Sequence, residues 1–396
     1  MNLTNRVDEK ELIELTKSLI QIKSPCYPGE YGEIIAFVKD KMEEIGMRVK
    51  TYPLFPYEEG SSKVNLIGTL GQCEKTGLLF YGHVDTVGVD EHLWTVPPFG
   101  GIVKEGRIYG RGATDMKGAV AAMLVAMKTL KSTCKNLKKN VQLLITVDEE
   151  VGKVWQIKYL MEKGIIDAEA LIVGEPSGVP GAIQVTIYHR GIAHYDIIAE
   201  GKTSHSNTPE KGVNAIYTIT EIVQALREKG LKYQIHPYLG NSVFNICHIQ
   251  GGSRRSYTVP AFCKAELEVR LVPGQTVSSV KREIKTIIES LRRKDPKIKA
   301  EVEFTDANYK DPSELSKNHP LTKLLCRIIK ELTGKYPNFG TGGGGEAYWF
   351  LKAGLPAVYL GPGEGPLCHE PDEYVSINNL ILAANTYLLT AEASCC

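Results

Sequence analysis

The stretch Leu78-Leu-Phe-Tyr-Gly-His-Val-Asp85 decides the fold of this chain. Its apolar run ends at Gly82, which is typical of a buried strand in a mostly parallel sheet. His83 and Asp85 follow at once, and polar groups just beyond such a strand stand where open α/β sheets bind ligands. Because residues two apart in an extended segment share a face, Asp85 can hold the second nitrogen of a metal-bound His83 imidazole.

Length and composition indicate a two-domain globular protein. The chain has 396 residues, 43% apolar and 23% charged, with a formal net charge of +1. This balance argues against nucleic acid or a membrane as the main partner. The polar N-terminus lacks a signal core, and the nine cysteines are scattered, so we expect a cytoplasmic protein with reduced thiols. The pair Cys395-Cys396 is expected to be a frayed end.

Two patterns of apolar and polar residues alternate along the chain. Residues 1–183 and 308–396 combine buried apolar strands with helices, which predicts an α/β domain with a mostly parallel sheet flanked by helices. The helix Ala119–Leu130 is apolar on nearly every side and should lie against that sheet. Residues 184–307 carry alternating strands and two helices, which predicts an inserted α+β domain. Insertion is tolerated because chain termini usually lie close together.

Several predicted strands and glycine loops of the α/β domain end in an acid or an imidazole. The residues concerned are His83, Asp85, Asp115, Glu149, Glu150, Glu175 and His369. If the strands share one sheet, their carboxyl ends converge, and clustered carboxylates need a compensating cation. Two histidines with three or more carboxylates suit a pair of zinc-like ions.

The adjacent acids Glu149 and Glu150 have separate expected roles. Neighbouring residues at a strand end point to opposite sides. One should therefore bind metal, while the other takes a proton from the attacking water and returns it to a leaving nitrogen. A solvated acidic turn is the alternative reading of Asp148-Glu149-Glu150 taken alone.

Six motifs together resemble a known family. They are Gly82-His-Val-Asp-Thr-Val, Tyr109-Gly-Arg-Gly-Ala-Thr-Asp-Met-Lys-Gly, Asp148-Glu-Glu-Val-Gly, Gly174-Glu-Pro-Ser, Ser204-His-Ser and His369-Glu-Pro-Asp-Glu. In this order they resemble the dinuclear zinc amidohydrolases and peptidases that include acetylornithine deacetylase, succinyl-diaminopimelate desuccinylase, aminoacylase and glutamate carboxypeptidase. The resemblance extends over nearly the whole chain.

The resemblance implies a role for each residue of the cluster. His83 and Glu175 would bind one metal ion, Glu150 and His369 the other, and Asp115 would bridge them. Glu149 would be the general acid and base, and Asp85 the partner of the His83 imidazole. Two divalent ions are implied, with zinc expected and cobalt or manganese as alternatives. A cis peptide after the bridging aspartate, at Asp115-Met116, is also implied.

The inserted domain matches the lid and dimerisation domain of that family, which implies a homodimer. His205 would help to stabilise the developing oxyanion in its own or the partner's site, and Arg270 would hold a substrate carboxylate. Two positions depart from the family pattern, Tyr257 in place of asparagine and Glu346 in place of aspartate. The glycine run 342–345 can cradle a carboxylate or simply form a turn.

These observations favour a metal-dependent amidohydrolase that acts on N-acyl amino acids with a free carboxylate, in the manner of a deacetylase or desuccinylase. A dipeptidase or carboxypeptidase of the same family is the alternative. A non-catalytic protein that binds an amino-acid derivative is a rival of another class. The presence of every expected ligand and of Glu149 argues against that rival.

Overall fold

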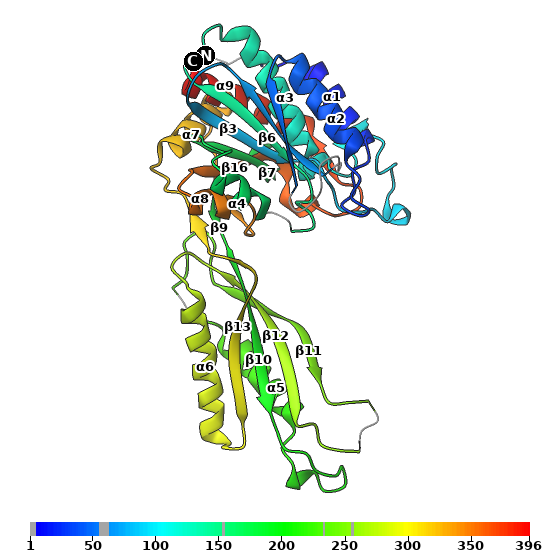
Figure 1. Ribbon diagram of the computed structural model, residues 1–396, viewed down its shortest axis with the longest axis vertical. Coiled ribbons are helices and arrows are strands. Elements are labelled where there is room, and N and C mark those ends of the chain that lie inside the picture. The colour runs from blue at the N-terminus through cyan, green and yellow to red at the C-terminus, as the bar shows by residue number, and fades with distance from the viewer. Residues whose placement is uncertain (1–4, 55–62, 153–154, 233, 255–256) are drawn as a thin grey trace. The chain divides into compact units, whose positions relative to one another are not determined.

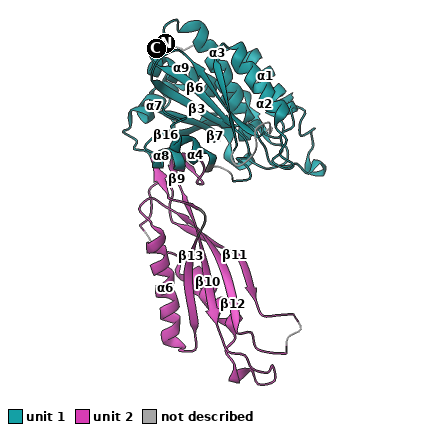
Figure 2. Cartoon of the chain, in the orientation of Figure 1, with its two compact units in different colours: residues 1–187, 315–340, 349–396 teal, residues 188–314, 341–348 magenta. Residues whose placement is uncertain are grey.

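The computed structural model describes residues 5–54, 63–152, 155–232, 234–254 and 257–396 (Figure 1). They form two compact units (Figure 2): residues 1–187, 315–340 and 349–396 make the first, and residues 188–314 and 341–348 the second. The sequence pattern predicts boundaries at 183/184 and 307/308. It does not predict that residues 341–348 also belong to the second unit, because a glycine run has no pattern of apolar and polar residues.

The first unit is built on a central sheet whose middle strands are parallel. Its strands lie in the order β1 (Arg48–Pro53), β2 (Val64–Leu70), β6 (Asn140–Thr146), β3 (Thr76–His83), β7 (Leu171–Val179), β16 (Ala357–Glu364) and β9 (Val185–His189). The pairs β6–β3, β3–β7 and β7–β16 are parallel, and the outer pairs are antiparallel. Every residue of β3 is buried. The predicted mostly parallel sheet is confirmed.

Helices cover both faces of this sheet. Phe80 and Tyr81 are neighbours in β3 and point to opposite faces. The Phe80 ring contacts Tyr387 of α9 (Ile377–Cys395), and the Tyr81 ring contacts Phe350 of α8 (Ala347–Lys352). On the α9 side α3 (Gly118–Thr133) packs against α9, and its residues 118–127 are all buried, as its apolar sequence predicts (Figure 1).

The first unit also contains further helices, short strands that pair with β7 and β9, and a second, smaller sheet. They are the helices α1 (Glu9–Gln21), α2 (Gly32–Glu44), α4 (Trp155–Glu162) and α7 (Pro320–Thr333), the short strands β8 (Ala182–Ile183) and β15 (Phe339–Gly342), and a three-stranded sheet of β4 (Ile102–Lys104), β5 (Arg107–Tyr109) and β17 (Tyr374–Ser376). Asp8 caps α1 by accepting from the Glu11 N–H at 3.0 Å. Among the described residues, no helix is both long and apolar enough to cross a bilayer.

The second unit is an α+β fold with its own core. Its antiparallel sheet has the order β11 (Val243–Gly251), β12 (Phe262–Leu271), β10 (Gly191–Glu200) and β13 (Lys299–Lys310). Residues alternate between buried and half-buried along β10 and β12. Their buried faces share a hydrophobic core with α5 (Ala215–Lys229) and α6 (Val277–Lys294). The predicted α+β unit is therefore present. The short strand β14 (Ser313–Glu314) ends the unit's main segment.

The C-terminus corrects two expectations. Helix α9 continues to Cys395, whose side chain is 1% exposed, so this end is not frayed. Cys396 forms a disulfide with Cys134 at the end of α3, so these two thiols are not reduced. The sequence cannot predict this pairing, because it depends on the packing of α3 against α9, whose cysteines are 262 residues apart.

Cys396→Ser is expected to lower the melting temperature of the oxidised protein. A disulfide that closes a long loop, here of 262 residues, stabilises by about 2–4 kcal/mol because it restricts the unfolded chain. For a unit of this size the expected fall is roughly 4–16 °C. Thermal denaturation followed by circular dichroism measures it. Cys247→Ser, which replaces an exposed free cysteine, is the control. If a reductant did not change the melting temperature of the unmodified protein, the expectation would be contradicted.

Candidate metal centre

The predicted ligands meet at the carboxyl edge of the parallel strands. His83 is the last residue of β3, Glu175 lies within β7, and Glu150 follows β6. Asp115 sits in the turn Ala113–Lys117, just before α3, and His369 lies on the connection between β16 and β17. Since neighbouring parallel strands end at one edge, side chains far apart in the chain come together there.

Three ligands form a first group around His83. Its Nε2 lies 3.1 Å from Asp115 Oδ1 and 3.3 Å from Glu175 Oε1. Donor atoms of all three residues lie within 4.8 Å of one another. The His83 side chain is 1% exposed, so strand β3 and its neighbours fix the imidazole.

Asp115 also belongs to a second group. His369 Nε2 lies 3.0 Å from Glu150 Oε2 and 3.5 Å from Asp115 Oδ2. Again the donor atoms of the three residues lie within 4.8 Å of one another. The two carboxylate oxygens of Asp115 therefore face different histidines, which is the arrangement that a bridging ligand needs. The peptide Asp115-Met116 is cis, as the resemblance implies.

Asp85 is fully buried behind His83. The His83 Nδ1 lies 3.1 Å from the Asp85 carbonyl oxygen and 3.5 Å from its Oδ1. The other carboxylate oxygen, Oδ2, accepts the backbone N–H of Glu150 at 3.0 Å. Asp85 thus orients the imidazole of the first group and also holds the backbone of a residue of the second.

The electrostatics of the cluster fit two cations. Burial alone would lower the pKa of His83, but hydrogen bonds to Asp115, Asp85 and Glu175 raise it well above its usual value. Hydrogen bonds to Asp115 and Glu150 raise the pKa of His369 to about 10. The buried Glu150 Oε1 has no hydrogen-bond partner among the described residues. Positive charge is therefore favoured at both histidines, and a nitrogen and oxygen donor set suits divalent zinc.

The acidic turn differs in one respect from the prediction. Strand β6 ends at Thr146, and Asp148 has a positive φ of 60°, so Glu149 and Glu150 lie in a turn beyond the strand. The side chains of the two residues are therefore separated by the conformation of this turn and not by the alternation of side chains along a strand. A carboxylate oxygen of Glu149 lies within 4.8 Å of one of Glu175, while Glu150 contacts His369.

A buried network that the sequence does not predict anchors this turn. The Tyr31 hydroxyl donates to Asp148 Oδ1 at 2.5 Å, and Lys63 Nζ contacts both Asp148 oxygens at 2.8–2.9 Å. Tyr31 and Asp148 are fully buried. The acid at position 148 is thus not part of a solvated triplet. Its partners are 117 and 85 residues away, so no local signal identifies them.

The sequence of the chain matches that of a known family. Residues 79–393 match the model of peptidase family M20/M25/M40. The chain belongs to this family. An acetylornithine deacetylase of Buchnera aphidicola subsp. Schizaphis graminum is 31% identical over 331 residues, 80% of each chain.

Solved structures agree on the fold. Aminopeptidase PepT of Bacillus cereus superposes with a TM-score of 0.76 at 22% identity, over 98% of this chain and 99% of that one. A Bacillus subtilis protein described as a dinuclear metal-binding peptidase of the M20 family superposes with a TM-score of 0.71 at 15% identity, over 98% of each chain. The resemblance inferred from the motifs is confirmed. This M20 chain is a hydrolase of amide or peptide bonds.

The predicted substrate residues of this M20 chain lie in the second unit. Arg270, near the end of β12, donates from Nε to Glu268 at 2.7 Å and from Nη1 to the Gly343 carbonyl at 2.9 Å. His205 is exposed in the loop after β10. Of the two positions that depart from the family pattern, Tyr257 is 77% exposed and Glu346 is buried at 1%.

Two further basic residues belong to this part of the second unit. Lys310 Nζ donates to the Gly344 carbonyl at 3.2 Å, next to the carbonyl that Arg270 contacts. Burial lowers the pKa of Arg190, and the positive charge of Arg270 lowers it further. Neither residue is predicted from the sequence, because a lone basic residue in a strand or loop gives no local signal.

Proposed function

We propose that this chain hydrolyses the amide bond of an N-acyl amino acid that carries a free carboxylate, with two zinc ions as cofactors. The similarity to acetylornithine deacetylase over most of both chains is the observation that carries this proposal. The two ligand groups that share Asp115 support the pair of ions. A cytoplasmic location also belongs to the proposal.

Each residue of the cluster has a separate role in this proposal. His83 and Glu175 would hold one ion, Glu150 and His369 would hold the other, and Asp115 would be a ligand common to the two groups. When bound, two divalent ions supply Lewis acidity for the amide carbonyl and for water. Asp85 fixes the ring of His83 through Nδ1. The Glu149 carboxylate accepts the proton of the attacking water and delivers it to the leaving nitrogen.

The cation cluster of the second unit supports recognition of a carboxylate. Arg270 and Lys310 donate to adjacent carbonyls, Gly343 and Gly344, and the positive charge of Arg270 contributes to the lowered pKa of Arg190. A planar guanidinium matches the two oxygens of a carboxylate, and the neighbouring positive charges raise the local potential for an anion. We assign the substrate carboxylate to Arg270.

Arg270→Ala is expected to raise KM by roughly 10–100-fold for carboxylate substrates, since hydrogen bonds to charged groups contribute about 1.5–3 kcal/mol. Steady-state kinetics on the substrate that emerges from the screen below measure this effect. Arg327→Ala, at an exposed arginine of α7 in the first unit, is the matched control. An unchanged KM for every carboxylate substrate would remove Arg270 from the recognition site.

A screen for released amine tests the reaction. N-acetyl, N-succinyl and N-formyl amino acids are compared with dipeptides, each with added zinc, cobalt or manganese and with chelator. The proposal expects the highest kcat/KM among the acyl amino acids and no turnover with chelator. A preference for dipeptides would favour the alternative, a dipeptidase or carboxypeptidase of the same family. No turnover on any substrate, with tight binding of one, would favour the non-catalytic rival.

We further propose a homodimer formed through the second unit. Arg270 pairs with Ile192 at one end of the sheet, and Phe262 pairs with Glu200 at the other. The eight residue steps between Ile192 and Glu200 span roughly 26 Å. His205 lies beyond Glu200 and bridges to Thr258, which precedes β12. One unit therefore does not bring His205 and Arg270 to the same small substrate, whereas two copies can exchange His205, the proposed oxyanion ligand.

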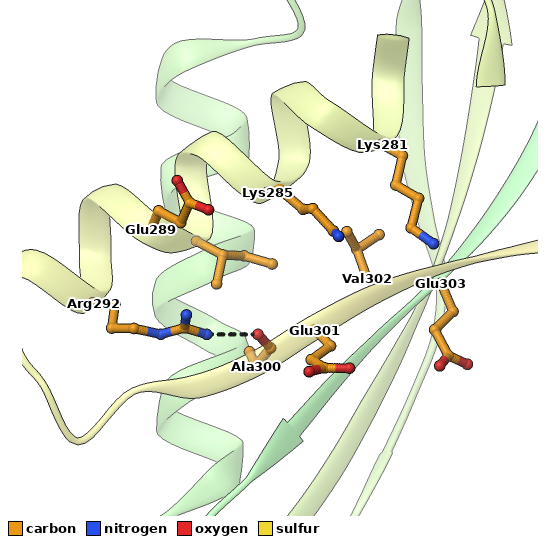
Figure 3. A pocket seen from close by; sticks show the side chains of 9 residues that line it. Lys281, Lys285, Glu289, Arg292, Ala300, Glu301, Val302 and Glu303 are labelled. Atoms are coloured by element: carbon orange, nitrogen blue, oxygen red, sulfur yellow. Dashed lines mark hydrogen bonds between the residues drawn. The ribbon is translucent and has the colours of Figure 1, made fainter. Parts of the chain in front are cut away.

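The two edges of the sheet differ in character. Strand β11 is an exposed edge, with Val243 and Ile249 50% and 48% exposed, and Ile249 lines a groove with Val223 of α5. The opposite edge, β13, is charged: its Glu301 and Glu303 line a pocket together with Lys281 and Lys285 of α6 (Figure 3). Charged edges resist strand pairing and apolar edges favour it. We therefore assign the dimer contact to β11.

Ile249→Asp is expected to shift the protein from dimer to monomer in sedimentation experiments, because it places a charge on the pairing edge. Ile102→Asp, at an exposed apolar residue of β4 in the first unit, is the control.

Mixed dimers of His205→Ala and Glu149→Gln chains test the exchange: random mixing should restore about a quarter of the activity if His205 acts in the partner's site. A monomeric unmodified protein with full activity would contradict the proposal.

A further inference from the structure

Arg111 and Glu373 form a buried ion pair beneath the metal centre. Arg111 Nη1 donates to Glu373 Oε2 at 2.6 Å, and their side chains are 4% and 0% exposed. Taking two charges out of water is unfavourable unless geometry and further hydrogen bonds compensate. The role of the pair therefore depends on the groups that it contacts. Neither residue is a proposed metal ligand.

Glu373 holds the segment that carries Asp115. Its second oxygen, Oε1, accepts the backbone N–H of Thr114 at 2.8 Å and that of Asp115 at 3.1 Å. Both donors lie in the tight turn between Gly112, which has a positive φ of 84°, and α3. A carboxylate that accepts two consecutive N–H groups fixes the direction of the backbone between them. Because the backbone is fixed, the direction in which the Asp115 side chain projects from it is also fixed.

Arg111 holds the segment that carries His369. Its Nη2 donates to the carbonyl of His369 at 3.1 Å, and its Nη1 also lies 3.4 Å from the Glu370 carbonyl. His369 has a positive φ of 67°, a conformation that a non-glycine residue keeps only when its surroundings enforce it. The guanidinium also lies 5.2 Å from the centre of the Trp94 ring. Its planar fork reaches Glu373 and His369 at once, which a lysine cannot do.

We propose that Arg111 and Glu373 are positioning residues that set the separation of Asp115 and His369, and so tune the affinity of the second metal group. This inference rests on the proposed function. The ligands of the first group, His83 and Glu175, stand on strands of the central sheet and have their backbone fixed by it. Asp115 and His369 stand on connecting segments, and the ion pair joins those segments directly. Loss of the pair therefore weakens the ion held by Asp115, Glu150 and His369 more than the other.

Zinc titration of metal-free protein tests the inference, with a competing chromophoric chelator to resolve the two ions. Glu373→Gln is expected to weaken one ion 10–100-fold, the range known for outer-shell partners of metal ligands, and the other less than about threefold. Arg111→Lys keeps the charge but loses the fork, and it should give the same pattern. Glu373→Asp keeps the charge but is one carbon shorter, and it should recover part of the affinity. Glu11→Gln, which breaks the exposed Lys128–Glu11 pair of the same unit, is the matched control.

These experiments distinguish a failure of this inference from a failure of the proposed function. Circular dichroism and melting of the metal-free variants show whether they fold; if Glu373→Gln does not, Arg111→Lys decides. Folded variants with both affinities within about threefold of the parent, or with both ions weakened equally, overturn the inference. If Asp115→Asn also leaves zinc affinity unchanged, the metal assignment fails instead, and with it the proposed function.

Discussion

Replacing Glu149 by glutamine is expected to lower kcat by roughly 10²–10⁴-fold, the contribution of a positioned general acid and base. Glutamine has nearly the same shape but cannot accept a proton from water. The Glu149 carboxylate lies within 4.8 Å of Glu175, so it borders the first ligand group. Zinc content and KM should therefore stay close to those of the parent, and the loss should appear in kcat alone. Steady-state kinetics and metal analysis on the same preparation measure both quantities.

Glu150→Gln is the matched control for this experiment. It is the adjacent acid in the same turn, and its Oε2 lies 3.0 Å from His369 Nε2. As a proposed ligand it should lower zinc content together with activity, and excess zinc should restore part of the activity. If Glu149→Gln kept kcat, the base would have to be another residue. If Glu149→Gln lost metal as Glu150→Gln is expected to do, the two roles would be wrongly divided.

The parallel core was predictable because its signal is local. The apolar run that ends at Gly82 is long, and the observed strand β3 contains it with every residue buried. The helix Ala119–Leu130 was predictable for the same reason, since a helix apolar on all sides has no stable place at a surface. Side chains that follow such strands meet at one edge as a matter of topology. His83 and Glu150 are of this kind, Glu175 lies within β7, and the structure brings each into a ligand group.

The parts that sequence could not predict depend on contacts between distant segments. The Cys134–Cys396 disulfide follows from helix packing, and the Tyr31–Asp148 hydrogen bond joins the start of α2 to the acidic turn. Glu373 belongs to a recognised motif, but its Arg111 partner is 262 residues away and is identified only by the fold. The sequence also did not predict that Glu149 and Glu150 lie in a turn beyond β6, because the left-handed conformation of Asp148 depends on its buried partners.

Asp115→Asn is expected to abolish activity, since Asp115 is the one residue common to both ligand groups. Loss of an outer-shell partner weakens metal binding about 10–100-fold, and loss of a shared ligand should exceed that for both ions. An ion present at 100 times its dissociation constant stabilises the folded state by about 2.7 kcal/mol. The rise in melting temperature that zinc produces in the parent protein should therefore be absent from the variant. Thermal denaturation with and without zinc, together with metal analysis, measures the change.

Asp196→Asn controls for the loss of a partly buried carboxylate. Asp196 pairs with Lys264 in the second unit, and its side chain is 17% exposed, close to the 12% of Asp115. It should leave zinc content and the zinc-dependent rise in melting temperature unchanged. If Asp115→Asn retained two ions, the two groups would not share a ligand, and each would have only a histidine and one glutamate. If it retained one, Asp115 would belong to a single group, and the hydrogen bond that Glu373 accepts from the Asp115 N–H would then position only that group.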